Sequence, residues 1–166
     1  NQLCAGIIEV LKKSILLPRQ IQTAIHLDST IPNIKTDRNG LKQVILNLVK
    51  NSAEAMENGG KIEIQTRFLP GSAKILIDEN KKLAGSIEIR IQDNGPGIAP
   101  GIMEKLFEPY NSSKKGKNSG LGLAIVHSIV KELNGTITCD SHHDRGTCFS
   151  VCLPITSPKI ASVEVL

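Results

Sequence analysis

Two glycine-containing segments hold the residues best suited to binding a ligand: Asp93-Asn94-Gly95-Pro96-Gly97-Ile98 and Gly120-Leu121-Gly122-Leu123-Ala124-Ile125. In the first, glycines let the backbone approach a ligand closely, next to the carboxylate of Asp93. The second opens a predicted helix, where free N–H groups and the helix dipole favour phosphate. A polar, lysine-bearing stretch separates them. Together they predict two walls of a nucleotide pocket with a flexible cover between them.

Asp93 continues a strand pattern toward the core. Ile87, Ile89 and Ile91 alternate on the inward face of a predicted strand, and the next residue on that face is Asp93. A buried carboxylate needs hydrogen-bond partners. We therefore expect Asp93 to accept a hydrogen bond from an amino group at the sheet edge, such as that of adenine. An aspartate that only caps a turn is the alternative.

Amide side chains follow one flank of a long predicted helix. Gln43, Asn47 and Asn51 recur at i, i+4 spacing beside an apolar stripe. Their oxygens are suited to Mg²⁺, which prefers hard oxygen ligands and shares them with phosphates and waters. Asn51 lies nearest the stripe and is the predicted ligand. A solvated helix border is the alternative interpretation.

Composition excludes several classes of protein. The 166 residues fit one domain, and 20 Lys and Arg against 16 Asp and Glu give a net charge of only +4, without long basic runs. With three Phe, one Tyr and no Trp, the stacking platforms of single-strand nucleic-acid binders are missing. No apolar run is long enough for a membrane span. The four cysteines lack zinc-ligand spacing, which predicts reduced core thiols in a cytoplasmic protein.

Hydrophobic periodicity predicts the elements that position these residues. Helices are predicted over 3–17, 37–58, 99–106 and 121–133, and strands over 20–26, 61–68, 86–93, 136–141 and 147–153, with a loop over 70–85. Strands grouped into hairpins predict an α+β fold, a two-layer sandwich with helices on one face of a mixed, mostly antiparallel sheet. We expect a lead-in helix over 1–17, one domain over 18–154 and a tail or linker over 155–166. The chain begins with Asn1 rather than Met, which indicates a piece of a longer protein.

Five segments in order resemble the ATP-binding catalytic domain of sensor histidine kinases, within the group that includes gyrase, Hsp90 and the mismatch-repair ATPases. The subgroup most similar is the nitrogen-regulation type, and the resemblance implies the Bergerat-type ATP-binding fold. The matching segments are 41–56 (N box), 93–98 (G1 box), 106–110 (F box), 120–125 (G2 box) and the closing Gly146-Thr147.

The resemblance implies roles for individual residues. Asn51 would bind Mg²⁺, with Asn47 beside it, and Lys114 would reach the phosphates from a lid spanning 111–119; these three are the implied catalytic residues. Asn111 departs from the phenylalanine common in the subgroup. The implied nucleotide-binding residues are Asn47, Asn51, Asp93, Gly95, Gly97, Ile98, Phe107, Lys114, Gly120, Leu121, Gly122, Leu123 and Thr147.

The implied activity is transfer of the γ-phosphoryl group of ATP to a histidine on a separate dimerisation domain that is absent from this chain, with a response regulator downstream. Asn47 occupies the position of the glutamate base of the ATPase relatives, and an amide cannot take a proton from water, which disfavours hydrolysis. His26, His127, His142 and His143 lack the His-Glu or His-Asp setting of an acceptor. The alternatives are a nucleotide-binding switch without phosphotransfer and a slow ATPase.

Overall fold

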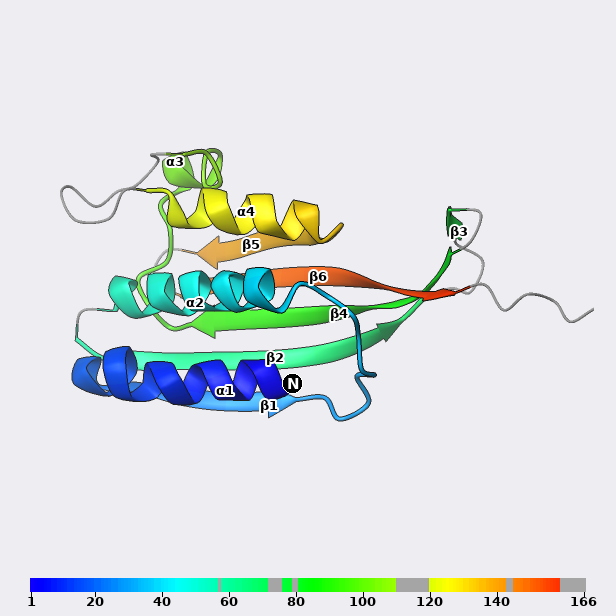
Figure 1. Cartoon of the computed structure of the whole chain (residues 1–166). Helices are drawn as coiled ribbons and strands as arrows, with labels where there is room; N and C mark the ends of the chain where they lie inside the picture. The colour runs from blue at the N-terminus through cyan, green and yellow to red at the C-terminus, as the bar shows by residue number, and fades with distance from the viewer. Residues whose placement is uncertain (57, 72–75, 79–80, 110–119, 143–144, 159–166) are drawn as a thin grey trace, which may run out of the picture.

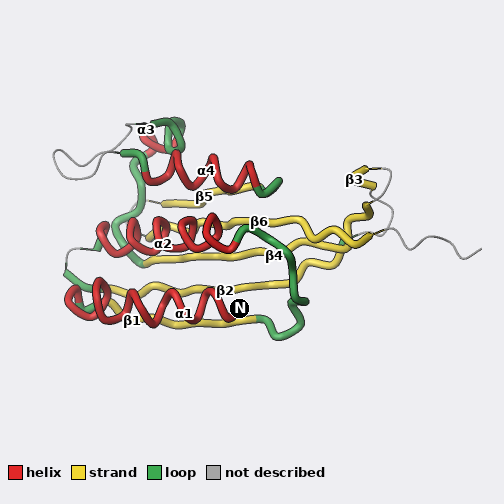
Figure 2. The backbone as a smooth tube through the Cα atoms, viewed as in Figure 1, coloured by secondary structure: helices red, strands yellow, loops and turns green. Residues whose placement is uncertain are grey.

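The computed structural model describes residues 1–56, 58–71, 76–78, 81–109, 120–142 and 145–158. The helices lie together on one face of a single twisted sheet, as Figures 1 and 2 show. This arrangement is the predicted two-layer α+β sandwich. No helix in the described part of the chain is long and apolar enough to cross a membrane.

The elements follow in a mixed order along the chain. The helical segments are α1 (Gln2–Leu11), the π-helical turn η1 (Lys12–Leu16), the 3₁₀ turn η2 (Leu17–Arg19), α2 (Arg38–Ala55), α3 (Pro100–Met103) and α4 (Gly122–Glu132). The strands are β1 (Ile21–Leu27), β2 (Gly60–Pro70), β3 (Leu76–Asp78), β4 (Lys81–Asp93), β5 (Thr136–His142) and β6 (Gly146–Pro158).

The sheet is mixed and mostly antiparallel, as predicted. Its strand order is β1-β2-β4-β6-β5, with β3 paired to β4 beside this path. Only β1 and β2 run parallel among the described pairs. The long central strands β4 and β6 pair from the Asp93–Thr147 end to the Lys81–Pro158 end. This register places Asp93 and Thr147 side by side at one end of these two central strands.

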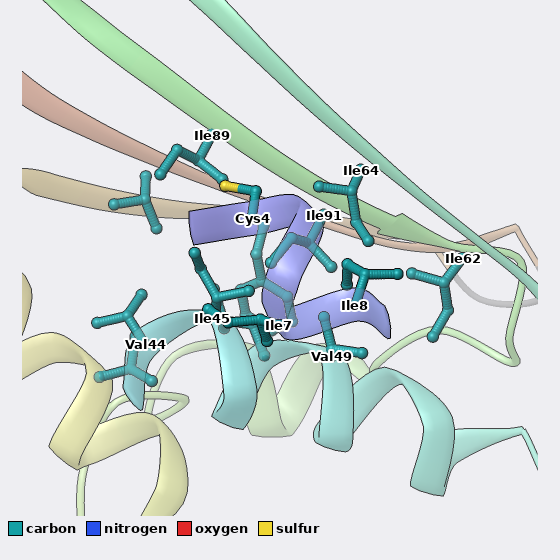
Figure 3. Packing of buried hydrophobic residues seen from close by; sticks show 14 of the residues in the cluster. Cys4, Ile7, Ile8, Val44, Ile45, Val49, Ile62, Ile64, Ile89 and Ile91 are labelled. Carbon is teal, nitrogen blue, oxygen red and sulfur yellow. The ribbon is translucent and has the colours of Figure 1, made fainter. Parts of the chain in front are cut away.

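The core lies between the helical layer and the inner face of the sheet (Figure 3). From the sheet, Ile62, Ile64 and Ile91 are fully buried. The helix predicted as a lead-in also belongs to this core, because α1 contributes buried side chains that pack against those of α2. The buried residues of these two helices include Cys4, Ile7, Ile8, Leu11, Val44, Ile45, Leu48 and Val49.

The strands are longer than the sequence predicts. The loop predicted over 70–85 is wrong, because β3 and the first residues of β4 lie within it. Likewise β6 continues through Pro158, into the segment expected to be a tail, where Ile155 pairs with Gly85 and Pro158 with Lys81. Both extensions depend on pairing between distant segments, which local pattern does not reveal.

Two helix ends also differ from expectation. The first helix continues as η1 and η2 to Arg19, past Pro18, since proline is tolerated at the start of a new helical turn. It ends where Gln20 adopts a left-handed conformation with φ of 56°. The short helix predicted over 99–106 is confined to Pro100–Met103.

The N-cap of α2 was predicted correctly. The Asp37 carboxylate accepts a hydrogen bond from the backbone N–H of Asn39 at 2.9 Å. Replacing Asp37 with alanine is expected to lower the free energy of unfolding by about 1 kcal/mol, whereas asparagine, an equally good N-cap, is expected to cost little. Urea unfolding monitored by circular dichroism measures both variants. Equal losses for the two would show that the side-chain oxygen does not stabilise the helix.

Candidate functional site

Asp93 is a buried carboxylate with one oxygen fixed by the protein. It is 4% exposed at the end of β4, as the alternating pattern predicts. Its Oδ1 accepts hydrogen bonds from the backbone N–H of Gly95 at 3.0 Å and of Thr147 at 3.1 Å. No described residue donates to Oδ2. The carboxylate is therefore held rigidly with an acceptor available for a ligand.

Gly146 and Thr147 close the site at the start of β6. Gly146 has a φ of +86°, and a Cβ at this position would overlap the carbonyl oxygen of Asp93. Only glycine allows this close approach between the two strands. Thr147 follows with 6% exposure on the inner face of the sheet, where it pairs in register with Asp93.

Ser141 joins the G1 segment to this hairpin, although the sequence pattern did not single it out as a site residue. Its Oγ accepts a hydrogen bond from the backbone N–H of Ile98 at 2.9 Å and lies 3.0 Å from Oγ1 of Thr147. The signal that identified Asp93 also marks this residue, because Ile137, Cys139 and Ser141 alternate on one face of β5 and the last of them is polar.

The amide of Asn51 faces the N-terminus of α4. A Cβ built on Gly122 would lie 3.7 Å from Oδ1 and 3.9 Å from Nδ2 of Asn51. These are ordinary contact distances, so the fold itself leaves room for a side chain at Gly122, and that room lies between the amide and the helix start. Asn47, one turn earlier on α2, is half-buried, whereas Gln43 is exposed.

The start of α4 presents backbone donors for which the described residues provide no hydrogen-bond partner. The first backbone bond of this helix runs from Ile125 to Leu121 at 2.9 Å, and no side chain caps its N-terminus. The N–H groups of the first turn therefore have no partner within the helix. The preceding Gly120 has a φ of +64°, which turns the chain into the helix. This geometry suits a phosphate, as the sequence predicts.

The G1 segment packs against the last turn of α2. A Cβ on Gly95 would lie 3.2 Å from Cγ of Met56 and 3.9 Å from Cβ of Ala55. These residues follow Asn51 by one turn. The contact brings the Asp93 segment and the amide-bearing helix together, and Figure 1 shows the end of β4, the C-terminal half of α2 and the start of α4 on the same side of the molecule.

Phe107 of the F-box segment contacts α4. Phe107 stacks on His127 with ring centroids 5.4 Å apart and an interplanar angle of 26°. Leu106 is buried in the core. The predicted nucleotide-binding residues of the G1, F and G2 segments, apart from the buried Asp93, are half-buried. Those residues are Gly95, Gly97, Ile98, Phe107, Gly120, Leu121, Gly122 and Leu123. The predicted catalytic Lys114 and the lid over 111–119 lie outside the described residues.

The donor set limits how this site can hold a cation. Within the described ranges no group of three His, Cys, Asp or Glu side chains lies close enough to bind a metal. A hard cation here would depend on the Asn51 amide oxygen together with oxygens supplied by the ligand and by water, which is the coordination that Mg²⁺ accepts. Ser52, which follows Asn51, has a buried hydroxyl for which no described residue provides a hydrogen bond.

Cysteine placement differs from the prediction of four core thiols. Cys4 is buried, but Cys139, Cys148 and Cys152 are only half-buried. Burial, followed by the charges of Cys148, Asp140 and Asp93, raises the pKa of Cys139 from 9.0 to about 12.

Cys139 is therefore expected to resist alkylation. At pH 8 the rise from 9.0 to about 12 lowers its thiolate fraction roughly a thousandfold relative to the unfolded chain. A thiolate of higher pKa is intrinsically more nucleophilic, which offsets part of the lower thiolate fraction. Reaction of Cys139 with iodoacetamide should therefore be at least about tenfold slower in the folded protein. The rate should rise as the pH increases from 9 toward 12. Mass spectrometry of the Cys139 peptide, with the urea-unfolded chain as control, measures this, and equal rates would contradict it.

Comparison with known proteins gives the same family throughout. The profile of the histidine kinase-, DNA gyrase B- and HSP90-like ATPases matches residues 36–157. Sensory histidine kinase/phosphatase NtrB of Rhizobium meliloti is 36% identical over 148 residues, which are 88% of this chain and 38% of NtrB. The chain thus spans well under half of this relative.

Solved structures share the fold. The catalytic domain of histidine kinase ThkA, in a nucleotide-free form, superposes with a TM-score of 0.73 at 25% identity, covering 93% of this chain and 91% of that domain. ThkA in complex with the response regulator TrrA superposes with a TM-score of 0.69 at 25% identity, covering 93% of this chain and 40% of ThkA.

Proposed function

This chain belongs to the histidine kinase-, DNA gyrase B- and HSP90-like ATPase family, and we propose that it is the catalytic domain of a two-component sensor histidine kinase. It binds Mg-ATP and transfers the γ-phosphoryl group to a histidine on a dimerisation domain outside this chain. The observation that carries the proposal is the Asp93 carboxylate, whose Oδ1 is fixed by two backbone N–H groups while Oδ2 is left for a ligand amino group.

Adenine recognition rests on the end of β4 and the start of β6. Oδ2 of Asp93 accepts from the exocyclic amino group, and a carboxylate at this position repels a base that presents a carbonyl oxygen there. Thr147 lines the floor beside it, and Gly95, Gly97 and Ile98 form the wall. Because Asp93 is already held in place, little side-chain ordering remains to be completed on binding.

Phosphate and metal recognition rest on α2 and α4. The first-turn N–H groups of α4 hold the phosphates, while the amide oxygen of Asn51, with Asn47 beside it, completes the shell of Mg²⁺. Bound Mg²⁺ supplies charge neutralisation at the phosphates. The Gly122 position fits this role, because the space that a Cβ would occupy lies next to the Asn51 amide. Lys114 from the lid is proposed to add a further positive charge.

Transfer, rather than hydrolysis, follows from the missing base. Asn47 holds an amide where the ATPase relatives have a glutamate, and an amide cannot activate water by taking its proton. Phosphoryl transfer requires mainly positioning and charge neutralisation, both of which this set supplies.

The acceptor and the partner lie outside the chain. His26 is on the exposed sheet face 3.5 Å from Glu63, His127 stacks on Phe107, and His142 lies 3.5 Å from Asp140. None of these three histidines is in the first turn of α4, and His143 lies outside the described residues. ThkA binds the response regulator TrrA, and we propose a cognate regulator for this kinase as well.

Two measurements test the proposal. Isothermal titration of the chain with ATP should show binding that Mg²⁺ strengthens, and absence of binding would refute it. With the full-length protein and radiolabelled ATP, acid-labile phosphohistidine should form. Binding without phosphohistidine would favour the nucleotide-dependent switch, and steady phosphate release abolished by Asn51→Ala would favour the slow ATPase.

A further inference from the structure

The Ser141 hydroxyl connects three backbone segments around the Asp93 site. It accepts from Ile98 N–H at 2.9 Å, donates to the carbonyl oxygen of Gly146 at 3.1 Å and lies 3.0 Å from Thr147 Oγ1. Ile98 belongs to the G1 segment, and Gly146 and Thr147 open β6. One half-buried hydroxyl therefore bridges the wall and the floor of the proposed adenine pocket.

A proton count shows that these contacts compete. A serine hydroxyl has one proton and two lone pairs, and the Ile98 N–H already occupies one lone pair. If the Ser141 proton goes to Gly146, Thr147 must donate to Ser141 and presents only lone pairs to a ligand. If the proton goes to Thr147, the Thr147 proton becomes free to point into the pocket. The group to which Ser141 donates its proton therefore decides whether the Thr147 hydroxyl can donate a hydrogen bond to a ligand or only accept one.

The adenine edge requires one of these two states. Its amino group is a donor and pairs with Oδ2 of Asp93, while the adjacent ring nitrogen N1 is an acceptor. The backbone N–H of Thr147 is committed to Oδ1 of Asp93 at 3.1 Å. The Thr147 hydroxyl is consequently the donor that this residue has left for N1.

We propose that Ser141 is a positioning residue for adenine recognition: it directs its proton to Thr147 when ATP binds, so that the Thr147 hydroxyl donates toward N1 of the base. Ser141 does not touch the nucleotide. The inference rests on the proposed function, because it requires adenine to occupy the Asp93 site. It adds to that function a pair of hydroxyl groups that favours a base with a hydrogen-bond acceptor at the N1 position.

The test compares ATP with 1-deaza-ATP, in which a C–H replaces N1. Wild type should bind ATP about tenfold more tightly than 1-deaza-ATP, the value of one hydrogen bond. Ser141→Ala leaves the Thr147 hydroxyl free to rotate among its three staggered positions, so this preference should fall about threefold, and Ser141→Thr, which keeps the hydroxyl, should restore it. Thr147→Val should abolish the preference, and adding Ser141→Ala to Thr147→Val should leave the ratio unchanged. Thermal unfolding confirms that each variant is folded.

Several results would overturn the inference. If Ser141→Ala weakens ATP and 1-deaza-ATP equally, the residue only holds the Ile98 loop in place. An unchanged ATP affinity in Ser141→Ala, or an unchanged ratio in Thr147→Val, contradicts it as well. If the alanine variant does not fold, Ser141→Cys carries the same comparison, since a thiol has similar size and is a weak donor. Failure of the proposed function is distinct, because wild type would then bind neither nucleotide.

Discussion

Replacing Asp93 with asparagine is expected to weaken ATP binding by about 100-fold, or about 2.7 kcal/mol, the size of a lost charge-assisted hydrogen bond. The substitution is nearly isosteric. The asparagine Oδ1 can still accept from the backbone N–H groups of Gly95 and Thr147, so the local fold is retained. What changes is the free position, where an acceptor becomes an amide donor that meets the adenine amino group donor to donor.

The same substitution is expected to shift base preference. Hypoxanthine presents a carbonyl oxygen where adenine has its amino group, so the Nδ2 of the new asparagine can donate to it. The ratio of ATP to ITP affinity should fall at least about tenfold from the wild-type value. Isothermal titration with both nucleotides measures this. Asp140→Asn, on the exposed face of β5, is the matched control and should leave both affinities unchanged. An Asp93 variant that keeps the wild-type ratio would remove Asp93 from base recognition.

Much of the fold and part of the site follow from local pattern. Period-two alternation places Asp93 inward because Ile87, Ile89 and Ile91 occupy the same face, and burial confirms it. The apolar stripe predicts the helix α2, and Asp37 as its N-cap predicts where that helix begins. In each case the signal lies within a few residues of the element that it predicts.

The errors concern pairing between segments distant in sequence. Residues 81–86 show no alternation, yet they form strand because β6 pairs with them. In β6 itself, Pro154 is locally unfavourable for a strand. However, β5 pairs with β6 only as far as Cys152, so beyond that point β6 has β4 as its one described neighbour and proline can face the open side. Such pairing is decided by the assembled sheet.

Ser141 marks a different limit. Its inward position is readable from the alternation of β5, but its role is not, since its partners Ile98 and Gly146 come from two other segments. A polar residue at an inward position is therefore a useful sequence signal, as it was for Asp93, while the chemistry that it performs depends on which segments the fold brings to it. Lys114 stays a prediction, since it lies outside the described residues.

Replacing Asn51 with alanine is expected to remove the Mg²⁺ dependence of ATP binding. In wild type, Mg²⁺ should tighten ATP binding markedly, and chelation by EDTA should reverse this. The variant loses the amide oxygen that faces Gly122 at the start of α4, so the metal keeps only ligand and water oxygens. Phosphohistidine formation by the full-length protein should fall by about 100-fold or more, comparable to removing one transition-state contact elsewhere. Titrations with and without Mg²⁺, and a phosphotransfer time course, measure the two effects.

Matched variants separate metal binding from a structural loss. Gln43→Ala lies two turns earlier on the same flank of α2, at an exposed position, and should behave as wild type. Asn51→Asp restores an oxygen ligand and should retain part of the Mg²⁺ effect, while its negative charge weakens ATP binding when the metal is absent. If Asn51→Ala keeps the full Mg²⁺ effect, the cation is held elsewhere. If all three variants lose ATP equally with and without Mg²⁺, this flank of α2 shapes the pocket without binding the metal.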